Sequence, residues 1–121
     1  MKEEEYQKML KMLIEATEAK KIVWNEEPNS KGAYSTYIGG CPVKVWKDYN
    51  FHTDEDSYTL VLANPDERVF STYSYSEGDA SEYYKQLSRL YLVISDVVYR
   101  ISESEKLILD GLKEMLGGKQ D

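Results

Sequence analysis

Cysteine, histidine, proline and phenylalanine are scarce in this chain of 121 residues, which has one, one, three and two of them. The single cysteine, Cys41, cannot form a disulfide within the chain, and one cysteine with one histidine cannot supply the four ligands of a structural zinc site. A Ser-His-Asp hydrolase would need His52 as its base, but no glycine-flanked serine accompanies it. The sequence therefore predicts no metal site and no catalytic residue, and we expect no cofactor.

Positive charge is also in short supply, because 22 acidic residues outnumber 15 basic ones and give a net charge of −7. Nucleic acids and anionic membranes attract lysine and arginine, so we expect neither as a partner. Residues 1–21 contain no apolar run of the length that a signal peptide or a spanning helix needs. Together with the lone cysteine, this favours a cytoplasmic protein. Basic proteins and small ligands remain open as partners.

The length and composition are those of one globular domain, with 41% hydrophobic and 31% charged residues. We therefore expect a single α+β domain over residues 1–121. Residues 3–19 should form a helix, because apolar side chains recur there at helical spacing. They are Tyr6, Met9, Leu10, Leu13 and Ile14.

In residues 22–76 apolar and polar residues alternate with a period of two, and turn residues lie between the short apolar runs. The first strand is expected at residues 22–24, and the clearest one at residues 57–63. Gly39-Gly40 and Asn64-Pro65 have the composition of tight turns. Short connections between successive strands favour an antiparallel meander of four or five strands.

Residues 79–116 return to helical spacing, with Asp79 in a position to cap the first turn. The apolar residues Leu87, Ile94, Ile101, Ile108 and Met115 fall seven apart, which fits one long helix. However, Ser102 and Glu105 have the spacing of a capping box, which would begin a second helix. We favour two helices with a bend, packed on one face of the sheet. Residues 117–121 should be a frayed tail.

The middle of this helical segment is apolar nearly all round, more than one sheet face can cover. We therefore expect a homodimer whose seam contains Leu90, Ile94 and Val98.

Tyrosine is abundant, with 11 residues, and it suits both strands and half-wet binding surfaces. If Trp46 faces outward with Tyr73 and Tyr75, the sheet carries an exposed aromatic patch. Arg89 and Arg100 lie about three helical turns apart and could add an anion-binding edge. The alternatives are core aromatic residues and a solvated helix face, and residue parity alone does not choose between them.

Three functions fit these features, and no motif selects one. The first is a small non-catalytic accessory protein that binds another protein through a tyrosine-rich surface. The second is a protein that binds or sequesters a small anionic ligand, such as a nucleotide. An enzyme comes last, because no nucleophile, base or metal set converges in the sequence.

Overall fold

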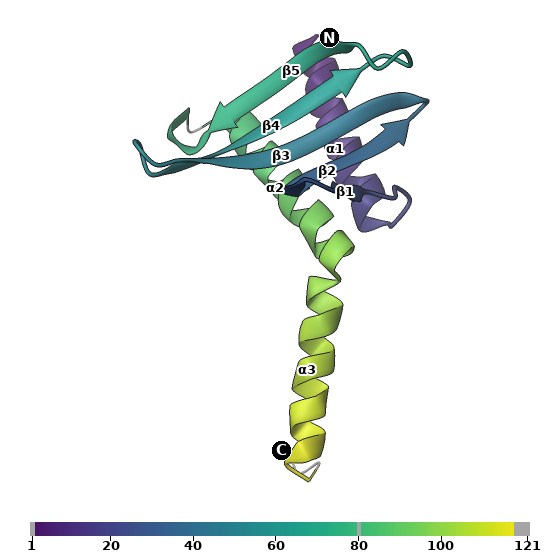
Figure 1. Ribbon diagram of the computed structural model, residues 1–121, viewed down its shortest axis with the longest axis vertical. Coiled ribbons are helices and arrows are strands. Elements are labelled where there is room, and N and C mark those ends of the chain that lie inside the picture. The colour runs from purple at the N-terminus through teal and green to yellow at the C-terminus, as the bar shows by residue number, and fades with distance from the viewer. Residues whose placement is uncertain (1, 80, 118–121) are drawn as a thin grey trace.

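The computed structural model of the protein describes residues 2–79 and 81–117 (Figure 1). Helix α1 comes first, five strands follow, and a short 3₁₀ turn leads into two further helices. Their bounds are α1 (Glu3–Glu18), β1 (Asn25–Glu27), β2 (Ser30–Ile38), β3 (Cys41–Asn50), β4 (Glu55–Ala63), β5 (Val69–Ser76), η1 (Glu77–Asp79), α2 (Glu82–Tyr99) and α3 (Ile101–Met115). The predicted α+β layout is confirmed, including the break between the last two helices. Most of the predicted tail, residues 118–121, lies outside the described residues.

The five strands form one antiparallel sheet in which each strand pairs with the next along the chain. Because side chains alternate between the faces of a strand, the pairing register decides which rows share a face. One row, facing the helices, is Tyr34, Val45, Leu60 and Tyr73. The neighbouring row on the other face is Ser35, Lys44, Val61 and Thr72. The sheet is thus apolar toward the helices and largely polar toward solvent.

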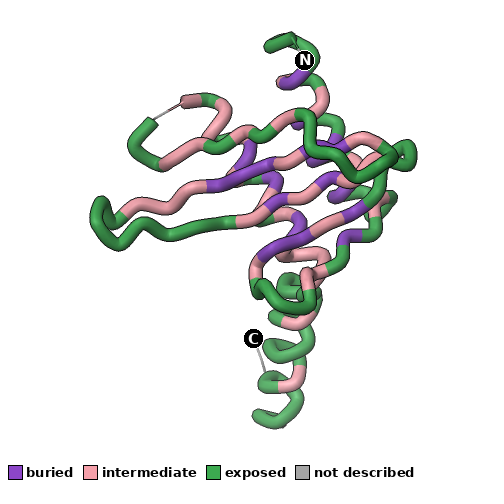
Figure 2. The backbone as a smooth tube through the Cα atoms, turned by 45° about the horizontal axis from the view of Figure 1, so that its top comes forward, coloured by how far each residue is buried: buried purple, intermediate pink, exposed green. Residues whose placement is uncertain are grey.

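The core lies between the sheet and the helices α1 and α2, which both lie on one side of it (Figures 1 and 2). Leu10 of α1 and Leu87, Leu90 and Ile94 of α2 are completely buried there. Burying a side chain of this size contributes about 1.5–3 kcal/mol. We call the sheet together with α1 and α2 the body of the protein.

Residues 22–24 do not form the first strand, contrary to the sequence-based prediction, and β1 begins at Asn25. Trp24 is buried instead, and its indole N–H donates a hydrogen bond of 3.0 Å to Oγ1 of Thr17. That hydroxyl in turn donates to the carbonyl oxygen of Leu13, at 2.7 Å. The segment after α1 is therefore held against that helix rather than in the sheet.

The predicted cap of the first C-terminal helix is also wrong. Asp79 lies in η1, where its carboxylate accepts a hydrogen bond of 2.7 Å from the backbone N–H of Ser76. Ser81 caps α2 instead, because its hydroxyl accepts the N–H of Tyr84 at 3.1 Å. Both residue types are good caps, and the turn at the end of β5 decides which one is used.

No helix in the described part of the chain combines the length and the apolar character needed to cross a membrane.

Candidate functional site

Helix α3 stands apart from the body of the protein (Figures 1 and 2). None of its residues is buried, and only Ser104 and Gly111 are even half-buried. In a folded domain an amphipathic helix usually places its apolar side on a core. The structure therefore contains a complete helix whose apolar side has no partner among the described residues.

The apolar side of α3 is a continuous stripe along the helix. Ile101, Ile108, Leu112 and Met115 lie within about 60° of one another around the helix axis, because successive residues are about 100° apart. We call these four residues the α3 stripe. Ile108 is 64% exposed and Met115 is 82% exposed. Such a row of exposed apolar side chains is typical of a protein-binding surface.

A bend at Arg100 sets the direction of α3. Arg100 adopts the left-handed conformation, with φ 53° and ψ 44°, which ends α2. Ser102 donates two hydrogen bonds of 2.9 Å, from its N–H and its hydroxyl, to one carboxylate oxygen of Asp96. The guanidinium of Arg100 donates two more to Glu103, at 2.8 and 2.5 Å. The predicted capping box of Ser102 and Glu105 is not formed, because Asp96 of the preceding helix takes that role.

This junction is too short to let α3 fold back. Only one residue, Arg100, separates Tyr99 at the end of α2 from Ile101 at the start of α3. Two antiparallel helices need a connection of about 2–5 residues. The α3 stripe therefore cannot turn back onto α2 of its own chain while the junction keeps this structure.

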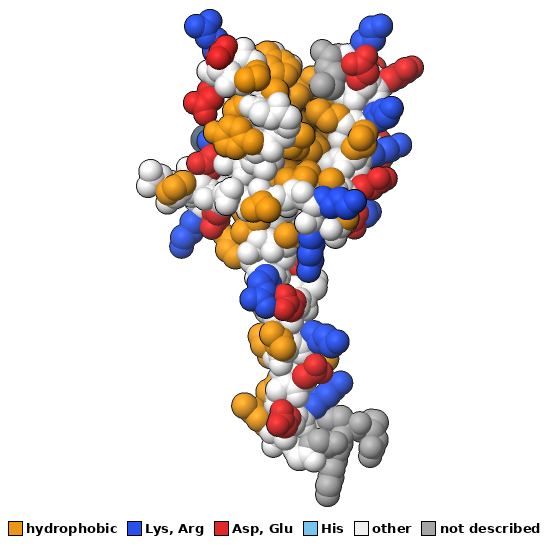
Figure 3. Space-filling view, turned by 90° about the vertical axis from the view of Figure 1, so that its right-hand side faces the viewer, with side chains coloured by type: hydrophobic (Ala, Val, Ile, Leu, Met, Phe, Trp, Pro, Cys, Tyr) orange, Lys and Arg blue, Asp and Glu red, His pale blue; other side chains and the backbone are white. Residues whose placement is uncertain are grey.

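A second uncovered apolar surface lies beside α1. Met9, Met12 and Leu13 of α1, with Ile22 and Ile38, line an open groove of about 550 Å³. We call it the α1 groove. A smaller hollow of about 190 Å³ shares three of its lining residues. This hollow continues the apolar surface to the residues Cys41, Pro42, Val43, Leu62, Ala63 and Phe70. Figure 3 faces this side of the molecule, where hydrophobic side chains gather in a hollow between charged residues.

Charged side chains border the α1 groove. Glu5, Lys8 and Lys21 line it together with the apolar residues. Two lysines with one glutamate make this border slightly basic, although the whole chain carries a net charge of −7. An apolar groove bordered in this way suits an amphipathic segment with acidic side chains beside its apolar face.

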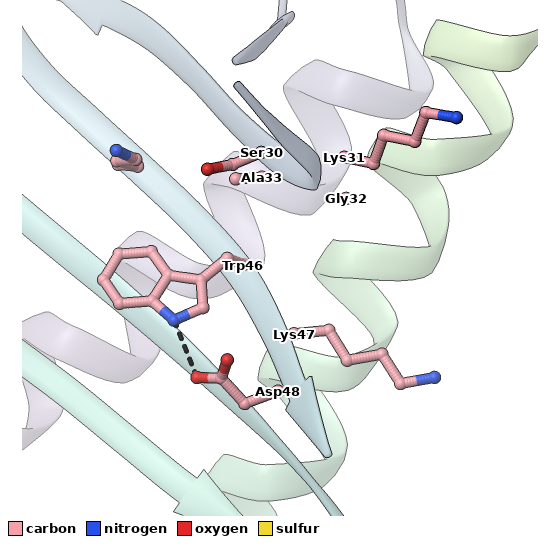
Figure 4. Close-up of a pocket in the computed structure, with 8 residues that line it drawn as sticks. Ser30, Lys31, Gly32, Ala33, Trp46, Lys47 and Asp48 are labelled. Atoms are coloured by element: carbon pink, nitrogen blue, oxygen red, sulfur yellow. Dashed lines mark hydrogen bonds between the residues drawn. The ribbon is translucent and has the colours of Figure 1, made fainter. Parts of the chain in front are cut away.

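The open face of the sheet carries a third feature, a shallow polar hollow of about 300 Å³ around Trp46 (Figure 4). The half-buried indole donates a hydrogen bond of 2.9 Å to the carboxylate of Asp48. The ammonium group of Lys44 lies 5.8 Å from the centre of the indole ring, within the range of a cation–π contact. Lys31 and Lys47 also line this hollow.

The structure does not bring the predicted aromatic patch together. Trp46 pairs with Thr59 and faces solvent, whereas Tyr73 and Tyr75 lie on the side of the sheet that faces the helices. Tyr73 stacks on Tyr6 of α1 with ring centres 4.1 Å apart. Trp46 and the two tyrosines therefore cannot contact one ligand.

The two candidate arginines are also apart from these residues, and both are exposed. Arg89 on α2 forms an ion pair of 3.5 Å with Glu18 of α1. Arg100 binds Glu103 at the bend, and this hydrogen bond raises the pKa of the guanidinium and lowers the pKa of the carboxyl group. Both arginines thus have carboxylate partners, and neither lines a hollow with Trp46.

The predicted dimer seam needs correction as well. Leu90 and Ile94 are completely buried against the core of their own chain, and Val98 packs against that core. A second copy cannot reach Leu90 and Ile94 without unfolding the body. The surplus of apolar surface that motivated this prediction lies further along the chain, in α3.

No group of three or more His, Cys, Asp or Glu side chains within residues 2–79 and 81–117 could hold a metal ion. His52 lies exposed in the turn between β3 and β4. The pKa of Glu26 is lowered by hydrogen bonds from the hydroxyl of Tyr99 and the N–H of Gly32, so this carboxyl group is ionised at neutral pH.

Sequence reasoning missed both uncovered apolar surfaces, the α3 stripe and the α1 groove. The repeat of seven residues was visible across residues 87–115, but a repeat does not tell which of its members a core covers. The α1 groove is assembled from α1, the segment directly after it and the end of β2, which comes close to that helix only in the folded chain. The one sequence signal for the α3 stripe was the predicted start of a second helix at Ser102, because a break in the helix allows α3 to leave the body.

Comparison of the chain with family models, with curated proteins and with solved structures finds no match.

Proposed function

We propose that this protein is a non-catalytic interaction module that binds a protein chain through the α3 stripe. The observation that carries the proposal is a complete amphipathic helix with none of its residues buried. An apolar side chain such as Ile108 or Leu112 contributes about 1.5–3 kcal/mol when it is fully buried in a partner. The stripe therefore offers enough binding energy to hold a partner that supplies an apolar surface.

The mode of binding follows from the helix itself. Its apolar residues recur at helical spacing, and its charged residues other than Glu105 lie toward the opposite side, as in helices that lie in a hydrophobic groove of their partner. The two bonds from Ser102 to Asp96 hold the first turn of α3 in place before binding. A helix ordered in advance loses less conformational entropy when it binds.

The tyrosines support this function from within the body. Tyr6, Tyr73, Tyr75 and Tyr83 contact one another between α1, β5 and α2. These rings fix both helices on the sheet, and α2 in turn carries α3. The proposed binding surface is thus the α3 stripe, with the tyrosines as its scaffold.

The test places a photo-crosslinking amino acid on α3 in living cells that make the protein. At Leu112, within the stripe, we expect a covalent adduct with a protein chain after illumination. At Asp110, about 160° away around the helix, we expect little or none. Equal yields at the two positions, or no protein adduct at Leu112, would contradict the proposal.

A second function, binding of a small anionic ligand with a flat ring, is favoured by the hollow at Trp46. The indole offers a stacking face, and Lys44 lies close to it. Lys44 and Lys47 already pair with Glu27 and Asp56, at 3.4 and 3.6 Å, so a ligand would have to compete with these carboxylates.

Fluorescence measures such binding directly. In a Trp24→Phe variant, Trp46 is the one remaining tryptophan. Titration with nucleoside phosphates should quench its emission, and Lys44→Ala should weaken the effect. Unchanged emission up to millimolar ligand would remove this second function.

A further inference from the structure

We propose that the α1 groove receives α3 of a second copy of this chain, so that two copies exchange their α3 helices. This inference rests on the proposed function and names its partner. In this arrangement each α3 stripe is buried in the α1 groove of the other copy, so both uncovered apolar surfaces are covered at once.

The first argument is that the chain cannot cover these surfaces itself. A single residue joins α2 to α3, and the bonds of Asp96 and Arg100 hold the bend open. Helix α3 thereby extends away from the body, as Figure 1 shows. Another chain must supply whatever buries it.

The second argument is a match of length and chemistry. The α1 side of the groove runs from Glu5 to Ala16, about 18 Å at 1.5 Å per residue. The α3 stripe runs from Ile101 to Met115, about 22 Å. Both surfaces are apolar along this length, so three turns of α3 would fill the groove.

The third argument concerns charge. Residues 101–115 carry four carboxylates and two lysines: Glu103, Glu105, Asp110 and Glu114, with Lys106 and Lys113. The border of the α1 groove carries two lysines and one glutamate. Five of these six side chains point away from the stripe, and Glu105 lies beside it, about 20° from Leu112 around the helix. Glu105 can therefore face a lysine of the border, although two whole chains of this charge repel each other.

The fourth argument is symmetry. Each chain carries one α1 groove and one α3 stripe, and both are uncovered among the described residues. A two-fold axis between two copies would place each stripe against the other copy's groove. Such an exchange is a closed, self-complementary interface, the commonest kind in homo-oligomers.

The buried area separates this arrangement from a simpler pairing of α3 with α3. A helix about 22 Å long and about 10 Å wide covers roughly 220 Å² in projection. Two helices in two grooves remove roughly 900 Å² of projected surface from water, and more when side-chain relief is counted. A pairing of two α3 helices removes about half as much, and it falls further short of the roughly 1,000 Å² of a stable interface than the exchange does.

The test combines the mass of the purified protein in solution with disulfide mapping. Cys41 is the one natural cysteine, and it lines the hollow that continues the α1 groove. We would introduce one cysteine at a time at Ile101, Ile108 and Met115, along the stripe, and at Asp110 on the opposite side as the matched control. All four positions are exposed, so the substitutions should leave the body folded.

The expected result is a particle with the mass of two chains. At least one stripe cysteine should form a disulfide with Cys41 of the other copy under mild oxidation. Asp110→Cys should give at least tenfold less of this product, and Cys41→Ser should abolish it. Mass spectrometry of the cross-linked peptides identifies the pair.

Two results would overturn the inference. A monomer at 100 μM would exclude exchange, and a dimer whose disulfides join α3 to α3 alone would exclude the α1 groove as the site. Neither result contradicts the proposed function if cellular crosslinking at Leu112 still captures a different protein. A failure of the proposed function is recognised separately, by the absence of any adduct at Leu112.

Discussion

Helices α2 and α3 are neighbours with 18 and 15 residues, and an apolar residue recurs at every seventh position through both. In α2 the members of this repeat, Leu87 and Ile94, are completely buried. In α3 the members Ile108 and Met115 are 64% and 82% exposed. The same periodicity therefore gives a core helix on one side of Arg100 and an exposed apolar surface on the other.

The difference between the two helices comes from their surroundings. Helix α2 lies across β4 and beside α1, which together cover its apolar side. Helix α3 begins past the edge of the sheet, where the left-handed conformation of Arg100 turns the chain away from the body. An apolar pattern thus indicates that one side of a helix will be buried. The fold decides whether the covering surface belongs to the same chain.

The sharpest way to break this comparison is a matched pair of substitutions in the repeat. Ile94→Ala should lower the free energy of unfolding by about 2–5 kcal/mol, because it leaves a cavity in the core. Ile108→Ala should change it by less than about 0.5 kcal/mol at concentrations where the chains are separate. Urea denaturation followed by circular dichroism measures both. Equal losses would mean that α3 packs on the body after all.

A smaller effect is expected at the junction of the two helices. Asp96→Ala removes the carboxylate that accepts two hydrogen bonds from Ser102 at the start of α3. Loss of such a cap costs about 0.5–2 kcal/mol, and an isolated helix of this length is marginal in water. Amide hydrogen exchange should accelerate in α3 and stay unchanged in α2. Acceleration in both helices would show that they unfold as one unit.

Alkaline pH should also affect the two regions differently. Burial raises the pKa of Tyr58 and of Tyr91 to about 12, from an ordinary value of 10. The folded protein therefore holds these protons more tightly than the unfolded chain between pH 10 and 12, so stability falls as the pH rises through this range. Residues 101–116 contain no tyrosine, and the loss should start in the body.

The ultraviolet absorbance of tyrosinate, measured as a function of pH, tests the raised pKa of these buried tyrosines directly. Tyr58→Phe should remove a component that titrates near pH 12 and should reduce the alkaline loss of stability. A Tyr58 that titrates near pH 10 would mean that solvent reaches this interface between α2 and the sheet.

The smallest effect is expected at the surface contact between α1 and α2. Arg89→Ala removes an ion pair with Glu18 in which both side chains are about half exposed or more. Exposed ion pairs of this kind contribute about 0–1 kcal/mol. The midpoint of urea denaturation should hardly move, and added salt should remove any difference from the unaltered protein. A loss above about 2 kcal/mol would show that Arg89 holds α1 in place.

Local features were largely predictable. The helix at residues 3–19, the strand at residues 57–63 and the bend near residue 100 follow from spacing and turn residues, which act over a few positions. The caps were not predictable, because Asp79 and Ser81 are both suitable and the end of β5 selects between them. Trp24 was assigned to a strand, and a single buried bond to Thr17 places it against α1 instead.

The candidate binding residues show the same limit. Strand parity placed Tyr73 and Tyr75 on one face, and the structure agrees. Parity did not tell which face the helices cover, so the sequence could not show that Trp46 lies on the opposite face from Tyr73 and Tyr75. The α1 groove was beyond reach for the same reason, since its walls come from segments that meet only in the folded chain.

By itself, then, the sequence determined the order of helices and strands, the antiparallel meander and the apolar repeat through residues 87–115. These depend on the conformation of each residue and on neighbours a few positions away. Only the tertiary structure decided that Leu90 and Ile94 belong to the core, that Trp46 faces solvent and that the α3 stripe is left uncovered. Burial depends on which distant segments come close, and that is set by the packing of the whole chain.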